Sequence, residues 1–298
     1  FREMEVRINN LTKQFGGFTA VNCLNITMTN GVYGLLGVNG AGKTTLMRML
    51  CTLLHPTDGQ ITCDGRDIFK MDGDYRKILG YLPQDFGYYP EFTVQDYLIY
   101  IAAIKGIRPA VAKKRVKELI AAVGLQKVAH KKMKKLSGGM KRRAGIAQAM
   151  LNNPKILILD EPTAGLDPNE RIRFRNLISE LAENRLVLLS THIVSDVEYI
   201  ANEILLMKDG SIMHRGTAEE LIDTMTEGVW KCFVRKNEVS RYLKQYKISN
   251  MKSEVQGVEL RIISKEKPME NAVLEDANLE DVFLYYFGEK AGEENVEI

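Results

Sequence analysis

Short runs of apolar residues, each followed by a loop and then by a helical pattern, recur through most of the chain. Residues 32–36, 156–159 and 186–190 are apolar at nearly every position. Such runs are typical of parallel strands whose two faces are both covered by helices. A helical pattern over residues 43–54 follows the first run. The order of strand, loop and helix predicts a βαβ core built on a parallel sheet.

Other hydrophobic patterns flank this core. Residues 5–26 alternate in short runs around Gly16-Gly17, and residues 59–69 alternate again, which predicts an N-terminal antiparallel β subdomain. Residues 77–82 predict another strand. Between residues 94 and 123 the apolar spacing becomes helical, and we expect a helical subdomain over about residues 88–150. Asp209-Gly210, between two apolar runs, predicts a hairpin.

The pattern changes again near residue 218. Strands are expected at residues 229–234, 252–255 and 258–263, and helices at residues 237–245 and 279–287. These elements predict a small C-terminal α+β domain. We therefore expect a nucleotide-binding domain at residues 1–217 and an accessory domain at 218–298, whose acidic tail, residues 289–298, is expected to fray.

Composition excludes several classes of protein. The 298 residues are 45% hydrophobic and 27% charged, and 41 basic against 38 acidic residues give a net charge of +3. This balance argues against a dedicated nucleic-acid binder, so no nucleic-acid partner is expected. Cys23, Cys51, Cys63 and Cys232 form no zinc-site spacing and are read as free thiols. No apolar run of about 18 residues is present, and the N-terminus lacks a signal-peptide pattern. A membrane role would therefore require a partner.

The loop after the first apolar run is the most specific chemical motif. Residues 37–45, Gly-Val-Asn-Gly-Ala-Gly-Lys-Thr-Thr, fit the G-x-x-x-x-G-K-[ST] pattern between a strand and a helix. Backbone N–H groups of such a loop wrap phosphates, Lys43 reaches the β and γ phosphates, and Thr44 offers a hydroxyl to Mg²⁺. A chance glycine-rich turn is the alternative. The expected nucleotide contacts are Asn39, Gly40, Ala41, Gly42, Lys43, Thr44 and Thr45.

Polar residues at the ends of the other strands complete a hydrolytic site. Asp160 fits the carboxylate on the Mg²⁺ side of a nucleotide hydrolase, and Glu161 could orient or deprotonate the attacking water. His192 is placed to hydrogen-bond a γ phosphate, and Gln84 can touch both the metal and the water. The structural alternatives are a helix-capping pair of acids before Pro162, a packing histidine and an ordinary loop glutamine.

A second candidate anion site follows about a hundred residues after the phosphate loop. Leu136-Ser137-Gly138-Gly139 leads directly into a basic helix, and the N-terminus of a helix attracts anions. From the residues alone, the purpose of this second site is open.

The ordered set of motifs resembles the ATP-binding cassette (ABC) ATPases over about residues 4–217. The resemblance implies a P-loop NTPase fold, ATP and Mg²⁺ as ligands, and ATPase activity. It implies that Ser137, Gly138 and Gly139 bind the γ phosphate of ATP held by a second cassette, and that Asp167 acts across that dimer. It also implies an aromatic residue that stacks on adenine, for which Phe15 fits best and Phe18 is the rival.

Two stretches, Ser-Gly-Gly-Met-Lys-Arg-Arg at residues 137–143 and Glu-Asp-Val-Phe-Leu at residues 280–284, are similar to cassette subunits of bacterial export-type transporters whose membrane subunit is a separate chain. This resemblance implies a multi-span membrane partner that docks on about residues 85–110, a homodimer or a paired cassette subunit, and a cytoplasmic location on the inner face of the membrane. Met140 and Ala164-Gly165 depart from common family residues, which affects the subfamily rather than the activity. The alternative within the family is a soluble ABC ATPase acting on ribosomes or DNA. A stand-alone P-loop GTPase is disfavoured because the chain has no Asn-Lys-x-Asp.

Overall fold

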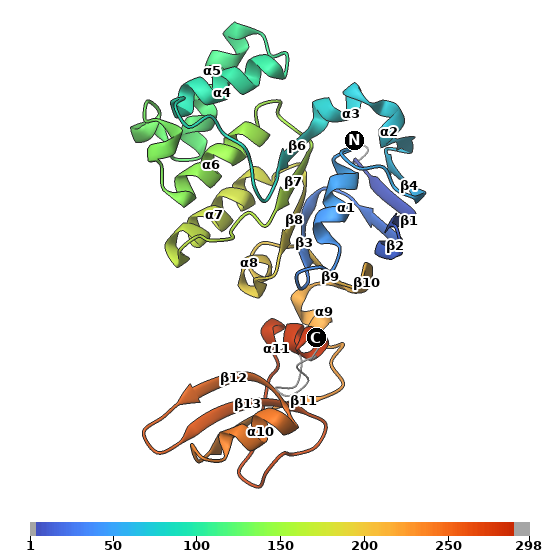
Figure 1. Cartoon of the computed structure of the whole chain (residues 1–298), viewed down its shortest axis with the longest axis vertical. Helices are drawn as coiled ribbons and strands as arrows, with labels where there is room; N and C mark the ends of the chain where they lie inside the picture. The colour runs from blue at the N-terminus through green and yellow to red at the C-terminus, as the bar shows by residue number, and fades with distance from the viewer. Residues whose placement is uncertain (1–3, 289–298) are drawn as a thin grey trace. The chain divides into compact units, whose positions relative to one another are not determined.

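The computed structural model describes residues 4–288, which form two compact units (Figure 1). The first unit runs to Met213 and the second begins at His214. The acidic tail at residues 289–298, which the sequence predicts to fray, lies outside the described residues.

Two sheets form the framework of the first unit. A six-stranded sheet has the order β10-β9-β3-β8-β7-β6, and its pairs β9/β3, β3/β8, β8/β7 and β7/β6 are parallel. A four-stranded antiparallel sheet has the order β2-β1-β4-β5. The strands are β1 (Val6–Phe15), β2 (Phe18–Met28), β3 (Gly31–Leu36), β4 (Asp58–Cys63), β5 (Arg66–Asp67), β6 (Leu79–Leu82), β7 (Ile156–Asp160), β8 (Leu186–Thr191), β9 (Glu203–Lys208) and β10 (Ser211–Gly216).

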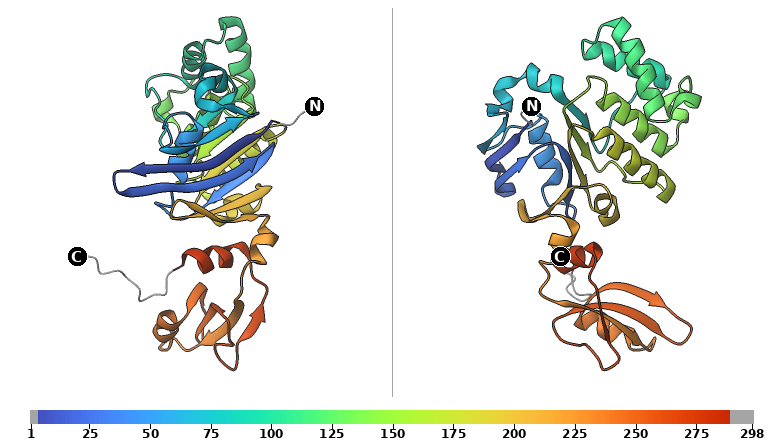
Figure 2. Two further views of the ribbon diagram at one scale, coloured as in Figure 1. Left: turned by 90° about the vertical axis from the view of Figure 1, so that its right-hand side faces the viewer. Right: turned by 180° about the vertical axis from the view of Figure 1, so that it is seen from behind.

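Helices cover both faces of the parallel sheet, as Figures 1 and 2 show. The helices are α1 (Lys43–Leu50), α2 (Ile68–Met71), α3 (Gly73–Ile78), α4 (Val94–Ile104), α5 (Pro109–Ala122), α6 (Gly138–Ala149), α7 (Pro168–Leu181) and α8 (Val194–Glu198), with short 3₁₀ turns η1 (Gln126–Val128) and η2 (Met133–Lys135). Apolar residues of α1 share one buried core with both sheets, so α1 is the layer between them. On the other face, α8 packs so tightly on β3 that a Cβ at Gly34 would lie 2.5 Å from Val197 Cγ1.

The predicted fold class is confirmed, and several element boundaries are corrected. The strand predicted at residues 77–82 begins only at Leu79, because Lys77 and Ile78 close helix α3. The helix predicted at 43–54 ends at Leu50, because Thr52 takes a positive φ of 57° that an α-helix cannot continue through. The helical pattern between 94 and 123 is divided into α4 and α5, and Pro109 occupies the first position of α5.

The second unit is an α+β fold of its own. Its antiparallel sheet has the order β12-β13-β11-β14, with β11 (Gly228–Val234), β12 (Lys247–Ser253), β13 (Val258–Ser264) and β14 (Val273–Glu275). Its helices are α9 (Ala218–Ile222), α10 (Val239–Gln245) and α11 (Leu279–Phe287). The strand predicted at residues 252–255 is β12, which begins five residues earlier, at Lys247, and ends at Ser253. Val255 lies outside it and is 95% exposed. β14 was not predicted, because three residues carry too little pattern.

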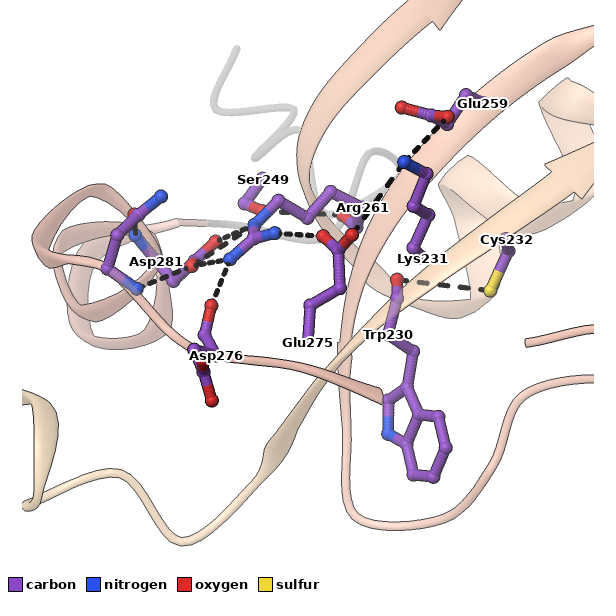
Figure 3. A network of polar contacts seen from close by, with 10 residues as sticks. Trp230, Lys231, Cys232, Ser249, Glu259, Arg261, Glu275, Asp276 and Asp281 are labelled. Carbon is purple, nitrogen blue, oxygen red and sulfur yellow. Dashed lines mark hydrogen bonds and ion pairs between the residues drawn. The ribbon is translucent and has the colours of Figure 1, made fainter. Parts of the chain in front are cut away.

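A polar network ties helix α11 to the sheet of the second unit (Figure 3). Arg261 on β13 donates to both carboxylate oxygens of Asp281, to Glu275 and to the carbonyl of Asp276. Asp281 is 1% exposed, and it also forms a capping box with Asn278 at the start of α11. Because every buried charge in this network has a partner of opposite sign, the network fixes the position of α11 without leaving a charge unpaired.

Candidate nucleotide-binding site

The phosphate loop connects the end of β3 to the start of α1, as the motif predicts. Gly42 precedes α1 with a φ of +103°, and a Cβ there would lie 2.3 Å from the carbonyl oxygen of Ala20. Only glycine fits this position, because a side chain would meet both a disfavoured backbone conformation and a backbone oxygen. The loop therefore presents its backbone at the N-terminus of a buried helix, which is the geometry of an anion site.

Lys43 is turned into the site and is only 6% exposed. Its Nζ donates to the carbonyl oxygens of Gly37 at 2.6 Å and Val38 at 3.1 Å, and lies 3.6 Å from Glu161 Oε1. Burial lowers the pKa of Lys43, while the nearby carboxylates of Glu161 and Asp160 act in the opposite direction. The ammonium group is thus poorly solvated and can exchange loop carbonyls for the oxygens of a phosphate.

Asp160 ends strand β7 and lies beside Thr44 of the phosphate loop. Its Oδ1 accepts hydrogen bonds from Ser190 Oγ at 2.6 Å and from Thr44 Oγ1 at 3.3 Å. Its Oδ2 is buried and has no hydrogen-bond partner among the described residues. A buried carboxylate oxygen without a partner is costly unless a ligand satisfies it, and a hard cation such as Mg²⁺ prefers oxygen ligands of this type. Asp160 and Thr44 therefore fit a magnesium site.

Glu161 is held in a conformation that turns it away from Asp160. Its φ of +46° lies in the left-handed region, which is uncommon for a residue with a side chain. Its N–H donates to Ser190 Oγ at 2.9 Å, and its Oε2 lies 3.0 Å from His192 Nδ1. The carboxylate thus lies between Lys43 and His192, and the ends of two neighbouring strands bring the predicted acid and the predicted histidine together.

The Ser-Gly-Gly turn forms a separate group. Ser137 caps α6 and its Oγ accepts from the N–H of Met140 at 3.2 Å, so the predicted helix N-terminus is confirmed. Asp167 caps α7 in the same way, and its Oδ1 accepts from the N–H of Glu170 at 2.9 Å. Among the described residues, no hydrogen bond or ion pair joins Ser137 or Asp167 to the phosphate loop. Within one chain the predicted residues therefore form two groups. One group is the phosphate loop with Asp160, Glu161 and His192, and the other is the Ser-Gly-Gly turn with Asp167.

Phe15 and Gln84 are placed at the edges of the site. Phe15 ends β1, is 48% exposed and carries Lys13 Nζ 5.1 Å above its ring, while Phe18 starts β2 and is 61% exposed. Gln84 is exposed in the segment after β6, and within residues 4–288 no hydrogen bond joins it to Asp160 or Glu161. Its part in the site stays a prediction.

Sequence reasoning missed two buried hydroxyl groups. Ser190 Oγ donates to Asp160 and accepts from the N–H of Glu161, so it sets the relative position of the two acids. Thr163 Oγ1 donates to Asp196, and both residues are almost completely buried. The signal for Ser190 was a polar residue at the end of an otherwise apolar strand next to His192. Thr163 and Asp196 lie 33 positions apart, and no local pattern links them.

Residues 4–288 contain neither a membrane-spanning helix nor a preformed cluster of metal-binding side chains. None of their helices is both long and apolar enough to cross a membrane. No group of three or more His, Cys, Asp or Glu side chains among them could by itself enclose a metal ion.

The sequence of the chain matches one family of known proteins. The family model described as ABC transporter matches residues 21–164. The bacitracin transport ATP-binding protein BcrA of Bacillus licheniformis is 39% identical over 211 residues, which are 70% of this chain and 68% of BcrA. The Nod factor export ATP-binding protein I of Burkholderia lata is 37% identical over 221 residues, 74% of this chain and 73% of that protein. This chain belongs to the ABC transporter ATP-binding proteins.

As an ABC ATPase, the chain binds and hydrolyses nucleotide on a P-loop NTPase core. The fold agrees with a dimeric structure of a bacterial ABC transporter cassette, which has a TM-score of 0.64, is 26% identical, and covers 71% of this chain and 98% of that one. The family assignment confirms the resemblance seen in the motifs, including the Leu-Ser-Gly-Gly sequence that identifies ABC ATPases among P-loop proteins.

Proposed function

We propose that this ABC ATPase powers an exporter whose membrane-spanning subunit is a separate chain. Two cassettes, either two copies or one copy and a paired cassette subunit, bind two ATP molecules head to tail and close around them. The separation of the site residues into two groups within one chain supports this arrangement. Each group alone is incomplete, and a partner supplies the missing half to each ATP. ATP then shifts the population from open to closed dimers, and hydrolysis reverses the shift.

Glu161 is the proposed general base, and its placement is the observation that carries the proposal. Its carboxylate lies at the carboxyl end of the parallel sheet, between the phosphate-loop lysine and His192. There it can orient or deprotonate the attacking water. The charge on the transferring phosphoryl group is stabilised by Lys43 and His192 of the same chain and by Ser137 of the partner subunit.

Magnesium is the proposed metal: Thr44 and Asp160 would hold it, and Gln84 is proposed as a further ligand. When bound, the ion neutralises negative charge on the β and γ phosphates. Ser190 keeps Oδ1 of Asp160 occupied, which leaves Oδ2 for the ion or for one of its waters.

Adenine is proposed to stack on Phe15. Its ring is about half exposed at the end of β1, so part of it can contact a ligand. Lys13 Nζ lies 5.1 Å from the centroid of this ring, a cation–π contact at the site proposed for adenine.

The membrane partner is proposed to dock on about residues 85–110, which places the ATPase on the cytoplasmic face of the membrane. Tyr89, Phe92 and Tyr100 form an aromatic cluster there, with ring centroids 5.1–5.6 Å apart. Tyr89 and Tyr100 are 47% and 38% exposed, and exposed aromatic residues favour protein interfaces. Residues 1–217 are the proposed nucleotide-binding domain and 218–298 the accessory domain.

The decisive experiment replaces Glu161 by Gln and measures both ATP turnover and dimerisation with ATP. We expect turnover to fall by about 10²–10⁴-fold, because a general base of this type contributes that much. ATP binding persists, so E161Q accumulates as an ATP-bound dimer. Glu180→Gln, an exposed carboxylate on α7, is the control and keeps wild-type turnover. Near wild-type turnover in E161Q would contradict the assignment of the base.

Export is tested by reconstituting the chain with its proposed membrane subunit. Reconstituted inside-out vesicles that contain both proteins should accumulate a transported compound only with ATP, and vesicles with E161Q should not. Depletion of the compound from the vesicle lumen with ATP would instead show import.

A further inference from the structure

Gly139, the second glycine of the Ser-Gly-Gly turn, lies against a carboxylate from another helix of its own chain. A Cβ at Gly139 would lie 2.5 Å from Glu170 Oε2, 2.8 Å from Cδ and 2.9 Å from Cγ. The same position at the neighbouring Gly138 meets nothing within 4 Å. A methyl group at position 139 would therefore force the Glu170 side chain to move.

Glu170 is fixed to the segment that contains Asp167. It is the third residue of α7, and its N–H donates to the Oδ1 of Asp167 that caps the helix. Its side chain is only 16% exposed and turns toward α6. The views in Figures 1 and 2 agree that α6 and α7 lie side by side. Glu170 is thus the point at which the first turn of α7 touches the first turn of α6.

Arg143 holds the same carboxylate from further along α6. Its Nε lies 3.5 Å from Glu170 Oε2, and its Nη1 donates to the carbonyl oxygens of Val123 and Gly124. Gly139 and Arg143 are four residues apart and so share one face of the helix. The other carboxylate oxygen of Glu170, Oε1, accepts from Arg173 Nη1 of α7 itself at 3.0 Å. We call Gly139 and Arg143 the Glu170 seat: Gly139 leaves room for the carboxylate, and Arg143 supplies a positive charge from α6.

We infer that Glu170 is a positioning residue that couples the Ser-Gly-Gly turn to Asp167. The inference rests on the proposed function, in which both of these segments act on the ATP of the partner. Two segments that act together on the ATP of the partner subunit must keep a fixed separation, since a displacement of about 1 Å can cost about 100-fold in rate. The Glu170 seat sets that separation, so the two segments approach the partner as one body.

A double-mutant cycle separates this role from direct contact between Gly139 and nucleotide. The variants are Gly139→Ala, Glu170→Ala and the pair together. We expect G139A to lower kcat by about 10- to 100-fold, because the added methyl displaces Glu170 and with it the turn. KM for ATP should stay within about twofold, because the phosphate loop is untouched. In the double variant, turnover equals that of E170A alone, since the methyl has nothing left to displace.

Gly138→Ala is the matched control, because it adds the same methyl group one residue earlier in open space. Its effect on kcat should be the same factor in the wild-type and in the E170A background. If G139A also lowers kcat by one factor in both backgrounds, the methyl acts elsewhere and the inference is overturned. Retention of wild-type kcat by E170A would overturn it too.

Folding and the proposed function are checked separately. If G139A is too unstable to assay, recovery of folded protein in G139A/E170A supports the contact, and failure of the double variant while E170A folds overturns it. If the wild-type protein neither turns over ATP nor dimerises with it, the proposed function fails. The cycle measured by thermal unfolding still tests whether Gly139 and Glu170 are coupled.

Discussion

His192 Nδ1 lies 3.0 Å from Glu161 Oε2, across the ends of the neighbouring strands β7 and β8. The contact leaves Nε2 as the ring nitrogen that can meet a phosphate. In the proposed function, His192 would thus link the general base Glu161 to the transferring phosphoryl group.

Replacing His192 by Ala should lower kcat by about 10²–10³-fold, because the phosphoryl group loses a donor and Glu161 loses the group that orients it. ATP affinity should change little, since Lys43 and the loop still bind the phosphates. Steady-state turnover and equilibrium ATP binding measure the two effects. His130→Ala, an exposed histidine outside the site, is the control. Equal losses in both variants would remove His192 from the mechanism.

Replacing Phe15 by Ala should weaken ATP binding by about tenfold, which corresponds to the loss of one base stacked on an aromatic ring. The titration follows a fluorescent ATP analogue. Phe18→Ala is the matched control, because Phe18 is the other exposed aromatic residue at the same hairpin. A larger loss in F18A than in F15A would assign adenine to Phe18 instead.

Replacing Ser137 by Ala should leave ATP binding to the isolated subunit unchanged and abolish closure and turnover, because Ser137 serves the partner's ATP. Loss of the helix cap should also lower stability by about 1 kcal/mol. Thr93→Ala removes a comparable cap from α4 and controls for that loss. Turnover, ATP affinity and ATP-dependent dimerisation are compared in both variants. A large drop in ATP affinity of monomeric S137A would mean that the serine contacts its own chain's nucleotide.

The second unit should lose stability in acid through Asp281. Burial raises the pKa of Asp281, but hydrogen bonds from Arg261, Ser249 and Asn278 outweigh it and hold the pKa below the ordinary value of 3.8. A depressed pKa means that the ionised carboxylate stabilises the fold. This contribution is complete above pH 3.8 and is lost as the pH falls through the lower folded value.

Asp281→Asn should therefore remove this acid dependence and cost about 2–3 kcal/mol at neutral pH, since a buried charged hydrogen-bonded pair is broken. Trp230, the only tryptophan of the chain, lies in β11 and reports unfolding of the second unit by fluorescence. Asp276→Asn is the control, because Asp276 meets Arg261 through its backbone carbonyl. An unchanged acid transition in D281N would show that other carboxylates cause it.

The sequence by itself determined the parts of the protein that local pattern encodes. The apolar runs of β3, β7 and β8 are hydrophobic because both faces of those strands are buried. An uninterrupted run of apolar residues therefore predicts these strands from the sequence alone. The phosphate loop could also be predicted from the sequence, because Lys43 and Thr44 follow the glycines of the turn at a fixed spacing. The family followed from Leu136 to Gly139 at its place between these motifs.

Only the tertiary structure decided how distant residues share a site. Ser190 meets Asp160 because β7 and β8 pair in a particular register, and Glu161 meets His192 because its backbone takes a positive φ. Gly139 meets Glu170 because α6 and α7 pack against each other. Such contacts join residues about 30 positions apart. Secondary-structure propensity depends on neighbouring residues, so it cannot predict these contacts. Register, backbone strain and helix packing are properties of the folded chain.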